Sequence, residues 1–210
     1  MLKNSELYHF LRRRTRSYLE FHHVEIGGLE NLVDLPNPVL VVSNHSPPKE
    51  NWVYTKKRPN HHLRSVDHLL VGAYLPEDHF IHTIASRHLY KNPIYRFLLN
   101  SIEQIPANGD KFLEDTMKYF SMGEDILIFP EGRTIDLTLN QIPIVKSGLG
   151  RLVVHLNNPN ILPINISSEG KKDILAMPWR KVFERASLTF GKHYTYKEEF
   201  NEYPINENGE

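Results

Sequence analysis

The chain has 210 residues, of which 40% are hydrophobic and 24% charged, and this length and composition fit one sizeable globular domain. Its 25 basic and 25 acidic side chains cancel, so overall charge argues against a nucleic-acid binder. The absence of cysteine excludes disulfides, thiolate metal sites and cysteine nucleophiles. No apolar run approaches the roughly 18–20 residues that cross a bilayer, and no signal-peptide core is present. We therefore expect a cytoplasmic protein, or one held peripherally at the cytoplasmic face of a membrane without a transmembrane span.

Residues 2–21 predict an amphipathic helix at the start of the chain. Leu7, Phe10 and Tyr18 recur at roughly helical spacing around the basic run Arg12-Arg13-Arg14. Helices of this kind often lie on anionic membrane surfaces, but the same pattern fits a helix packed on the domain with a solvated arginine face. Both interpretations stay open at the level of sequence.

Short apolar runs then alternate with helical patterns. Strands are expected at residues 24–26, 39–42, 80–85, 102–105, 125–129, 161–166 and 188–190. Helices are expected from Ser65 to residue 73, from Pro93 onward, and over residues 111–120 and 147–156. This alternation predicts an α/β fold, a single layered domain with a mostly parallel or mixed central sheet flanked by helices. We expect residues 1–22 to form the N-terminal helix, residues 23–200 the domain, residues 46–60 a loop insertion, and residues 201–210 a frayed acidic tail.

The strand expected at residues 125–129 runs directly into Pro130-Glu131-Gly132-Arg133. In open α/β sheets, ligands bind at such strand ends. The guanidinium of Arg133 can fork onto a phosphate, Gly132 permits close approach of a ligand to the backbone, and Glu131 can bond a substrate hydroxyl. Lys146 and Gly148, ahead of the next helix, can add positive potential and an anion-binding helix start. The alternative is an ordinary turn with solvated charges.

His62 and Asp67 are a candidate base and its orienting acid. The carboxylate of Asp67, in the first turn of a helix, can hold one imidazole nitrogen of His62 and leave the other free to take a proton from a hydroxyl. No protein nucleophile is needed, because a substrate alcohol can attack an activated ester or thioester. The chain contains twelve histidines, so this spacing also arises by chance.

Together these motifs resemble the glycerophospholipid acyltransferase family, the 1-acyl-sn-glycerol-3-phosphate acyltransferases of PlsC type. The family carries Asn-His-x4-Asp after a strand, Phe-Pro-Glu-Gly after a later strand, and then a Leu/Val-Pro strand. Here these correspond to residues 60–67, 129–132 and 162–164, and residues 86–93 resemble a further conserved stretch. The resemblance spans roughly residues 35–195. An arginine that the family usually carries for the acceptor has no counterpart in residues 105–108.

This chain departs from the family at the first motif, because the Asn-His pair that follows the strand directly is Asn44-His45. We favour His62 as the base because its spacing to Asp67 is local. His45 meeting Asp67 in space is the alternative, and His45 with Glu50 is a third option that two intervening prolines disfavour.

The resemblance implies an O-acyltransferase that moves a fatty acyl group from acyl-CoA or acyl-carrier protein to a lysophosphatidate-like glycerophosphate. His62 would deprotonate the acceptor, Asp67 would orient His62, and Glu131, Gly132, Arg133 and Lys146 would bind the substrate. No cofactor and no metal are implied. The expected partners are the acyl donor, the lyso-glycerophospholipid and a membrane surface.

Two other classes of function are compatible with the sequence. The disturbed histidine motif allows a catalytically silent lipid-binding protein of the same fold. A metal-dependent hydrolase using His61, His62, Asp67 and His68 is disfavoured, because these residues lack helical His-x3-His spacing and a bridging acidic cluster.

The groove for the acyl chain is not located by the sequence. The apolar side chains of Tyr90, Tyr95, Phe97 and Leu98 are candidates to line it, but we favour the hydrophobic core for each of them.

Overall fold

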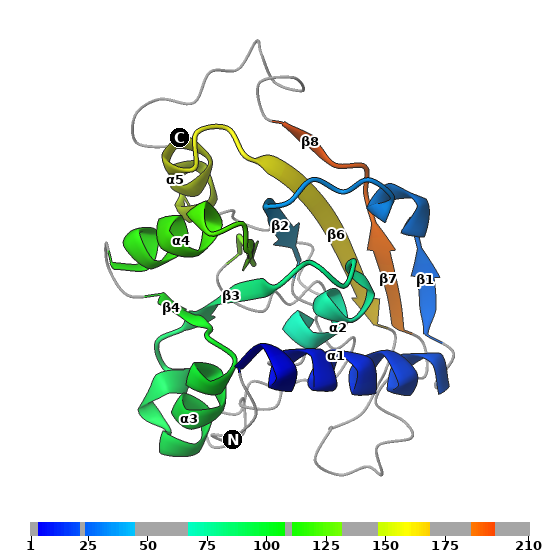
Figure 1. Cartoon of the computed structure of the whole chain (residues 1–210), viewed down its shortest axis with the longest axis horizontal. Coiled ribbons are helices and arrows are strands. Elements are labelled where there is room, and N and C mark those ends of the chain that lie inside the picture. Colours follow the sequence, from blue (N-terminus) through cyan, green and yellow to red (C-terminus); the bar gives the residue numbers. More distant parts are fainter. Residues whose placement is uncertain are drawn as a thin grey trace, which may run out of the picture.

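The structure is a computed structural model that describes residues 4–21, 24–44, 67–107, 111–131, 147–168 and 186–195. It contains a mixed eight-stranded sheet in the order β1-β7-β6-β2-β5-β3-β4, with β8 pairing to β6 (Figure 1). The predicted α/β domain with a mixed central sheet flanked by helices is therefore confirmed. Among the described helices, none is long and apolar enough to cross a membrane.

The strands and helices follow the predicted order along the chain. The strands are β1 (Glu25–Gly27), β2 (Val39–Ser43), β3 (Ile81–Ser86), β4 (Ile105–Ala107), β5 (Asp125–Ile128), β6 (Asn160–Ser168), β7 (Ala186–Phe190) and β8 (Tyr194–Thr195). The α-helices are α1 (Asn4–Phe21), α2 (Asp67–Tyr74), α3 (Pro93–Ser101), α4 (Lys111–Ser121) and α5 (Gly148–His155), and two short 3-10 helices are η1 (Leu29–Leu32) and η3 (Leu89–Lys91). The loop insertion expected at residues 46–60, the Ser65 cap and the tail lie outside the described residues.

The centre of the sheet is parallel. Strand β2 pairs with β5 on one side and with β6 on the other, and β3 pairs with β5 and β4, all in parallel. All four side chains of β5, and four of the five in β2, are buried, as expected for strands covered on both faces. Parallel pairing brings the carboxyl ends of β2, β3, β5 and β6 to one edge of the sheet.

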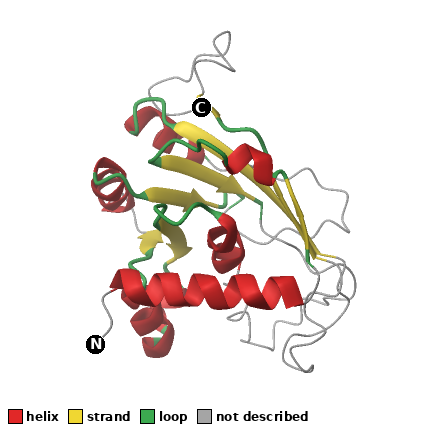
Figure 2. Cartoon of the chain, turned by 45° about the vertical axis from the view of Figure 1, so that its right-hand side comes forward, coloured by secondary structure: helices red, strands yellow, loops and turns green. Residues whose placement is uncertain are grey.

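Helices cover both faces of this sheet. Val39, Val41 and Leu127 point into a core shared with α1 and α2, and the alternate residues Leu40 and Ile126 point into a second core shared with α4 and α5. Figures 1 and 2 show the long α1 together with α2 on one side of the sheet, and Figure 1 shows α4 stacked near α5. The result is a three-layer α/β/α arrangement.

Helix α1 is amphipathic, as predicted, and one face of it is part of the domain. Tyr8 and Leu19 are buried in the first core, and the Arg12 guanidinium donates to the carbonyl oxygens of Pro76 (2.9 Å) and His79 (3.4 Å). Of the basic run, Arg12 is therefore a buried packing residue, whereas Arg13 and Arg14 are exposed. The packed interpretation is therefore confirmed for one face of the helix, and membrane contact through the exposed face stays a prediction.

A buried polar network joins the amino ends of β2, β3 and β5. The Asp125 carboxylate accepts from the backbone N–H of Val39 (2.9 Å) and bonds His79 Nδ1 (2.7 Å), and both side chains are almost fully buried (0% and 1% exposed). Burial lowers the pKa of His79, but the hydrogen bond and charge of Asp125 outweigh it and raise that pKa overall. Burial also raises the pKa of Asp125, against the lowering influence of His79. The folded pair therefore holds its proton more tightly than the unfolded chain does.

The strand expected at residues 102–105 is displaced toward the C-terminus. Helix α3 continues to Ser101, the chain turns through Glu103 with φ of 51°, and the strand begins only at Ile105. Gln104 explains the shift, because its backbone N–H bonds Leu99 O (2.9 Å) while its side chain accepts from the Thr83 N–H (2.7 Å). The apolar pattern indicated a strand from residue 102, but the turn that ends α3 takes up the first residues of that pattern.

The expectation that four aromatic and aliphatic residues near α3 belong to the core is wrong for two of them. Tyr90 and Tyr95 are partly buried, but Phe97 and Leu98 are exposed on the outer face of α3. Helical spacing marked them as one face, and the tertiary structure leaves that face uncovered by the described residues.

The His79–Asp125 pair predicts how folding stability depends on pH. The free energy of unfolding should fall as pH rises above about 6.5 into the alkaline range, because histidines of the unfolded chain titrate near pH 6.5 and the pKa of folded His79 is higher. This stabilisation is complete below the unfolded pKa and is lost as pH rises through the folded one. Asp125→Asn should flatten part of the decline, since an amide does not stabilise an imidazolium.

Urea unfolding across this pH range measures the free energy of unfolding of the unaltered protein and of Asp125→Asn. The other histidines contribute equally to both proteins, so the difference between the two slopes reports on His79. Equal slopes in the two proteins would contradict the assignment.

As a check on the network itself, Asp125→Ala should lower the free energy of unfolding by about 3–5 kcal/mol, because it leaves a buried partner uncompensated.

Candidate functional site

The carboxyl edge of the sheet carries polar residues at the ends of two neighbouring strands. Asn44 follows β2 and Glu131 lies just beyond β5, and the register pairs Val42 with Ile128. Neighbouring strands lie about 4.8 Å apart, so two strands that end at the same level bring these residues to one place. The ends of parallel strands are where ligands bind in open α/β sheets.

Asn44 fixes the point at which the chain leaves β2. Its side-chain amide donates to Ile166 O (2.9 Å), and its side-chain oxygen accepts from the Ile166 N–H (2.7 Å). The last backbone pair in this ladder joins Ser43 to Ile164, so the amide takes the place of the next backbone pairing and releases the main chain from the sheet. The sequence named Asn44 for its motif, but no sequence signal revealed this clamp.

Two helices begin at the same edge. Helix α2 connects the carboxyl end of β2 to the amino end of β3, so its first residue, Asp67, starts on the carboxyl side. Helix α5 connects β5 to β6 in the same sense, which puts Gly148 on that side as well. The described ends of the two polar motifs, the Asp67 backbone and Glu131, thus lie at one edge through the topology of the sheet.

Glu131 is the one predicted site residue whose side chain is described, and it is buried. Asp67 is described in its backbone only. His62, Gly132, Arg133 and Lys146, together with the alternative base His45, lie outside the described residues. The structure thus supplies the frame of the site from Asn44, Asp67 and Glu131, and the imidazole is assigned by proposal.

The histidine–acid pairs that are described lie at the opposite edge. Asp125 opens β5 and Ile128 ends it, so the His79–Asp125 pair is about 10 Å from the carboxyl end of the strand at roughly 3.3 Å per residue. His82, also fully buried, bonds Glu103 O (2.6 Å) and Glu124 (2.7 Å) and stacks on the Tyr119 ring. Both imidazoles have their nitrogens occupied away from solvent, so we assign them structural roles.

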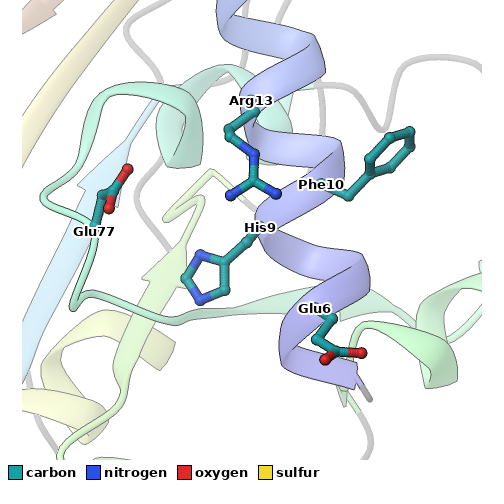
Figure 3. A pocket seen from close by; sticks show the side chains of 5 residues that line it. All are labelled: Glu6, His9, Phe10, Arg13 and Glu77. Carbon is teal, nitrogen blue, oxygen red and sulfur yellow. The ribbon is translucent and has the colours of Figure 1, made fainter. Parts of the chain in front are cut away.

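A cavity of about 520 Å³ opens beside α1, lined by Glu6, His9, Phe10, Arg13 and Glu77. In Figure 3 the His9 ring points toward Glu77, whereas Phe10 points away from it. Glu77 lies in the turn between α2 and β3, at the amino end of the strands. This cavity is therefore at the wrong edge to serve the residues around Glu131.

Within the described part of the chain, no three His, Asp or Glu side chains are grouped so that they could hold a metal ion. The set His61, His62, Asp67 and His68 falls on side chains that are not described.

Comparison with solved structures finds similar folds. The 1-acyl-sn-glycerophosphate (LPA) acyltransferase PlsC from Thermotoga maritima superposes with a TM-score of 0.60 at 17% sequence identity, over 95% of this chain and 74% of that one. At this identity the likeness establishes the fold. A comparison with curated protein sequences gives no significant match.

The sequence itself matches the Acyltransferase family over residues 23–167, more than half of the chain. This segment contains β2, the start of α2, β5 and β6, and therefore the whole edge at which Asn44 and Glu131 meet. The order of motifs, the parallel strands that bring them together and the extent of the match agree, and the chain belongs to the Acyltransferase family.

Proposed function

We propose that this protein is an O-acyltransferase that moves a fatty acyl group from acyl-CoA or acyl-carrier protein to the hydroxyl of a lysophosphatidate-like acceptor. The observation that supports the proposal is the shared edge: Asn44 at the end of β2, the start of α2 at Asp67 and Glu131 after β5 all lie on the carboxyl side of one parallel sheet. A base and an acceptor site need this proximity to act on one small alcohol.

The chemistry assigned to this edge is direct transfer. His62 accepts the proton of the acceptor hydroxyl, and the hydroxyl oxygen attacks the thioester carbonyl. The carbon–sulfur bond breaks, and the departing thiolate takes the proton back from the imidazolium. Asp67 keeps the imidazole in the required tautomer and stabilises its charged form. The reaction needs no covalent acyl-enzyme, cofactor or metal ion.

The acceptor is assigned to the corner after β5. Arg133 and Lys146 supply positive charge for the phosphate, and Gly132 lets it approach the backbone. The Glu131 carboxylate accepts a hydrogen bond from a glycerol hydroxyl. A phosphorylated glycerol has both groups, which is why we place lysophosphatidate or a related lyso-glycerophospholipid here and assign the protein to phospholipid biosynthesis at the cytoplasmic face of a membrane.

The assignment of the base is tested by replacing each of the two candidate histidines with alanine. His62→Ala should lower acyl transfer by at least about a hundredfold, the usual contribution of a general base, whereas His45→Ala should retain most of the activity. Transfer of a radiolabelled acyl group from acyl-CoA to lysophosphatidate is the measurement. The opposite pattern would move the base to His45, and no turnover by the unaltered protein with any donor or acceptor would favour a silent lipid-binding protein.

The role of the buried carboxylate is tested by Glu131→Gln, which preserves size and removes charge. Loss of a hydrogen bond to a charged group should raise KM for the acceptor by about tenfold or more, with a smaller change in kcat. Initial rates at varied acceptor concentration give both constants, and thermal unfolding shows whether the fold is intact. An unchanged acceptor KM in a folded variant would remove Glu131 from the acceptor site.

A further inference from the structure

The outer face of α3 is apolar and uncovered by the described residues. Ile94, Phe97 and Leu98 are 69%, 63% and 50% exposed. They stand at positions i, i+3 and i+4 of the helix, so they form one continuous stripe. A surface helix ordinarily turns its apolar stripe inward and its polar residues to solvent. Helix α3 instead presents this apolar stripe to the outside, which indicates that another molecule covers it.

The helix is also placed apart from the two cores. Its buried residue, Leu99, belongs to neither core cluster of the described residues. It is tied down by local bonds instead: Asn92 caps it by accepting from the N–H groups of Ile94 (2.9 Å) and Tyr95 (3.3 Å), and Leu99 O accepts from Gln104. Helix α3 is thus a firmly built projection at the β3–β4 end of the sheet (Figure 1).

The charges around the stripe identify the occupant. Within residues 86–107 there are three basic side chains, Arg87, Lys91 and Arg96, against one acidic side chain, Glu103. All three basic residues are exposed. An apolar stripe on a segment with an excess of exposed positive charge complements an anionic lipid surface, where the stripe enters the acyl boundary and the cations meet the headgroups.

The exposed face of α1 has the same character. Phe10, Phe21, Arg13 and Arg14 are exposed on it, and the Arg14 guanidinium lies 5.4 Å from the centroid of the Phe10 ring. The amino-terminal end of α1 lies close to α3 in both views of the chain (Figures 1 and 2). A lipid surface is broad enough to meet both helices, whereas a single peptide ligand is not.

We propose that Ile94, Phe97 and Leu98 form a lipid-docking patch that inserts into the interface of an anionic bilayer. The patch follows the carboxyl end of β3 through η3, so docking brings the edge that carries Glu131 toward the membrane. This rests on the proposed function only for its purpose, which is to let a lipid acceptor reach the site without leaving the bilayer.

The test compares Phe97→Ser/Leu98→Ser with a matched control, Val33→Ser/Met122→Ser, whose two side chains are 66% and 62% exposed elsewhere on the protein. The full chain is sedimented with two kinds of vesicle. One contains phosphatidylcholine alone, and the other contains equal parts of phosphatidylcholine and phosphatidylglycerol. The unaltered protein and the control should bind the anionic vesicles, and the patch variant should bind at least about tenfold more weakly. Equal binding by the patch variant, or binding that ignores lipid charge, would overturn the proposal.

Turnover separates this inference from the proposed function. With a short-chain lysophosphatidate held below its micelle concentration, the patch variant should match the unaltered protein, and with acceptor embedded in vesicles it should be slower. An equal loss with both acceptors would make the stripe part of the acyl-chain groove and overturn docking. Absence of turnover by the unaltered protein would overturn the proposed function and leave the vesicle result standing. Sedimentation velocity gives the oligomeric state. If the unaltered protein were a dimer and the patch variant a monomer, the stripe would be the contact with a second copy of the chain, and this would contradict docking on lipid.

Discussion

The hydrogen bond between the Asp125 carboxylate and the Val39 N–H is the constraint from which the functional edge follows. It joins the first residues of β2 and β5, one position before the register pair of Leu40 and Ile126, and fixes the register of the two strands where they begin. A slip of one residue would separate this bond and turn every side chain of β2 to the wrong core. With the register fixed at the amino ends, the carboxyl ends of the two strands also lie side by side, and Asn44 and Glu131 follow them at the same edge.

The two edges of the sheet differ in role: the amino edge holds a buried structural network, and the carboxyl edge holds the proposed site. At the amino edge, His79 and Asp125 are enclosed, saturated with hydrogen bonds and further covered by Arg12 of α1. Such a pair specifies and stabilises the fold, but no substrate can reach it. At the carboxyl edge the backbone leaves the sheet at Asn44, whose amide closes the ladder against Ile166.

The arrangement of the helices extends this division to the surface. Helix α1 is anchored through Tyr8, Arg12 and Leu19, so it belongs to the domain while its other face stays exposed. Helix α3 is held by capping and turn bonds and turns apolar residues outward. The proposed transfer to a lipid acceptor would need a stable domain and an apolar surface beside it, and separate faces of the helices offer these two features.

The sequence by itself determined the order of the elements, the α/β class and the motif that ends in Glu131, because apolar periodicity and strand-ending turns are local properties. It misplaced the strand before Ala107 and put Phe97 and Leu98 in the core, because periodicity marks a helical face without saying what covers it. Only the tertiary structure decided that Asp125 and His79 form a pair, that Asn44 bonds Ile166, and that Asn44 and Glu131 share an edge. These contacts join residues that are 46 to 122 positions apart, or the ends of separate strands, and are set by strand order and register, which no local pattern encodes.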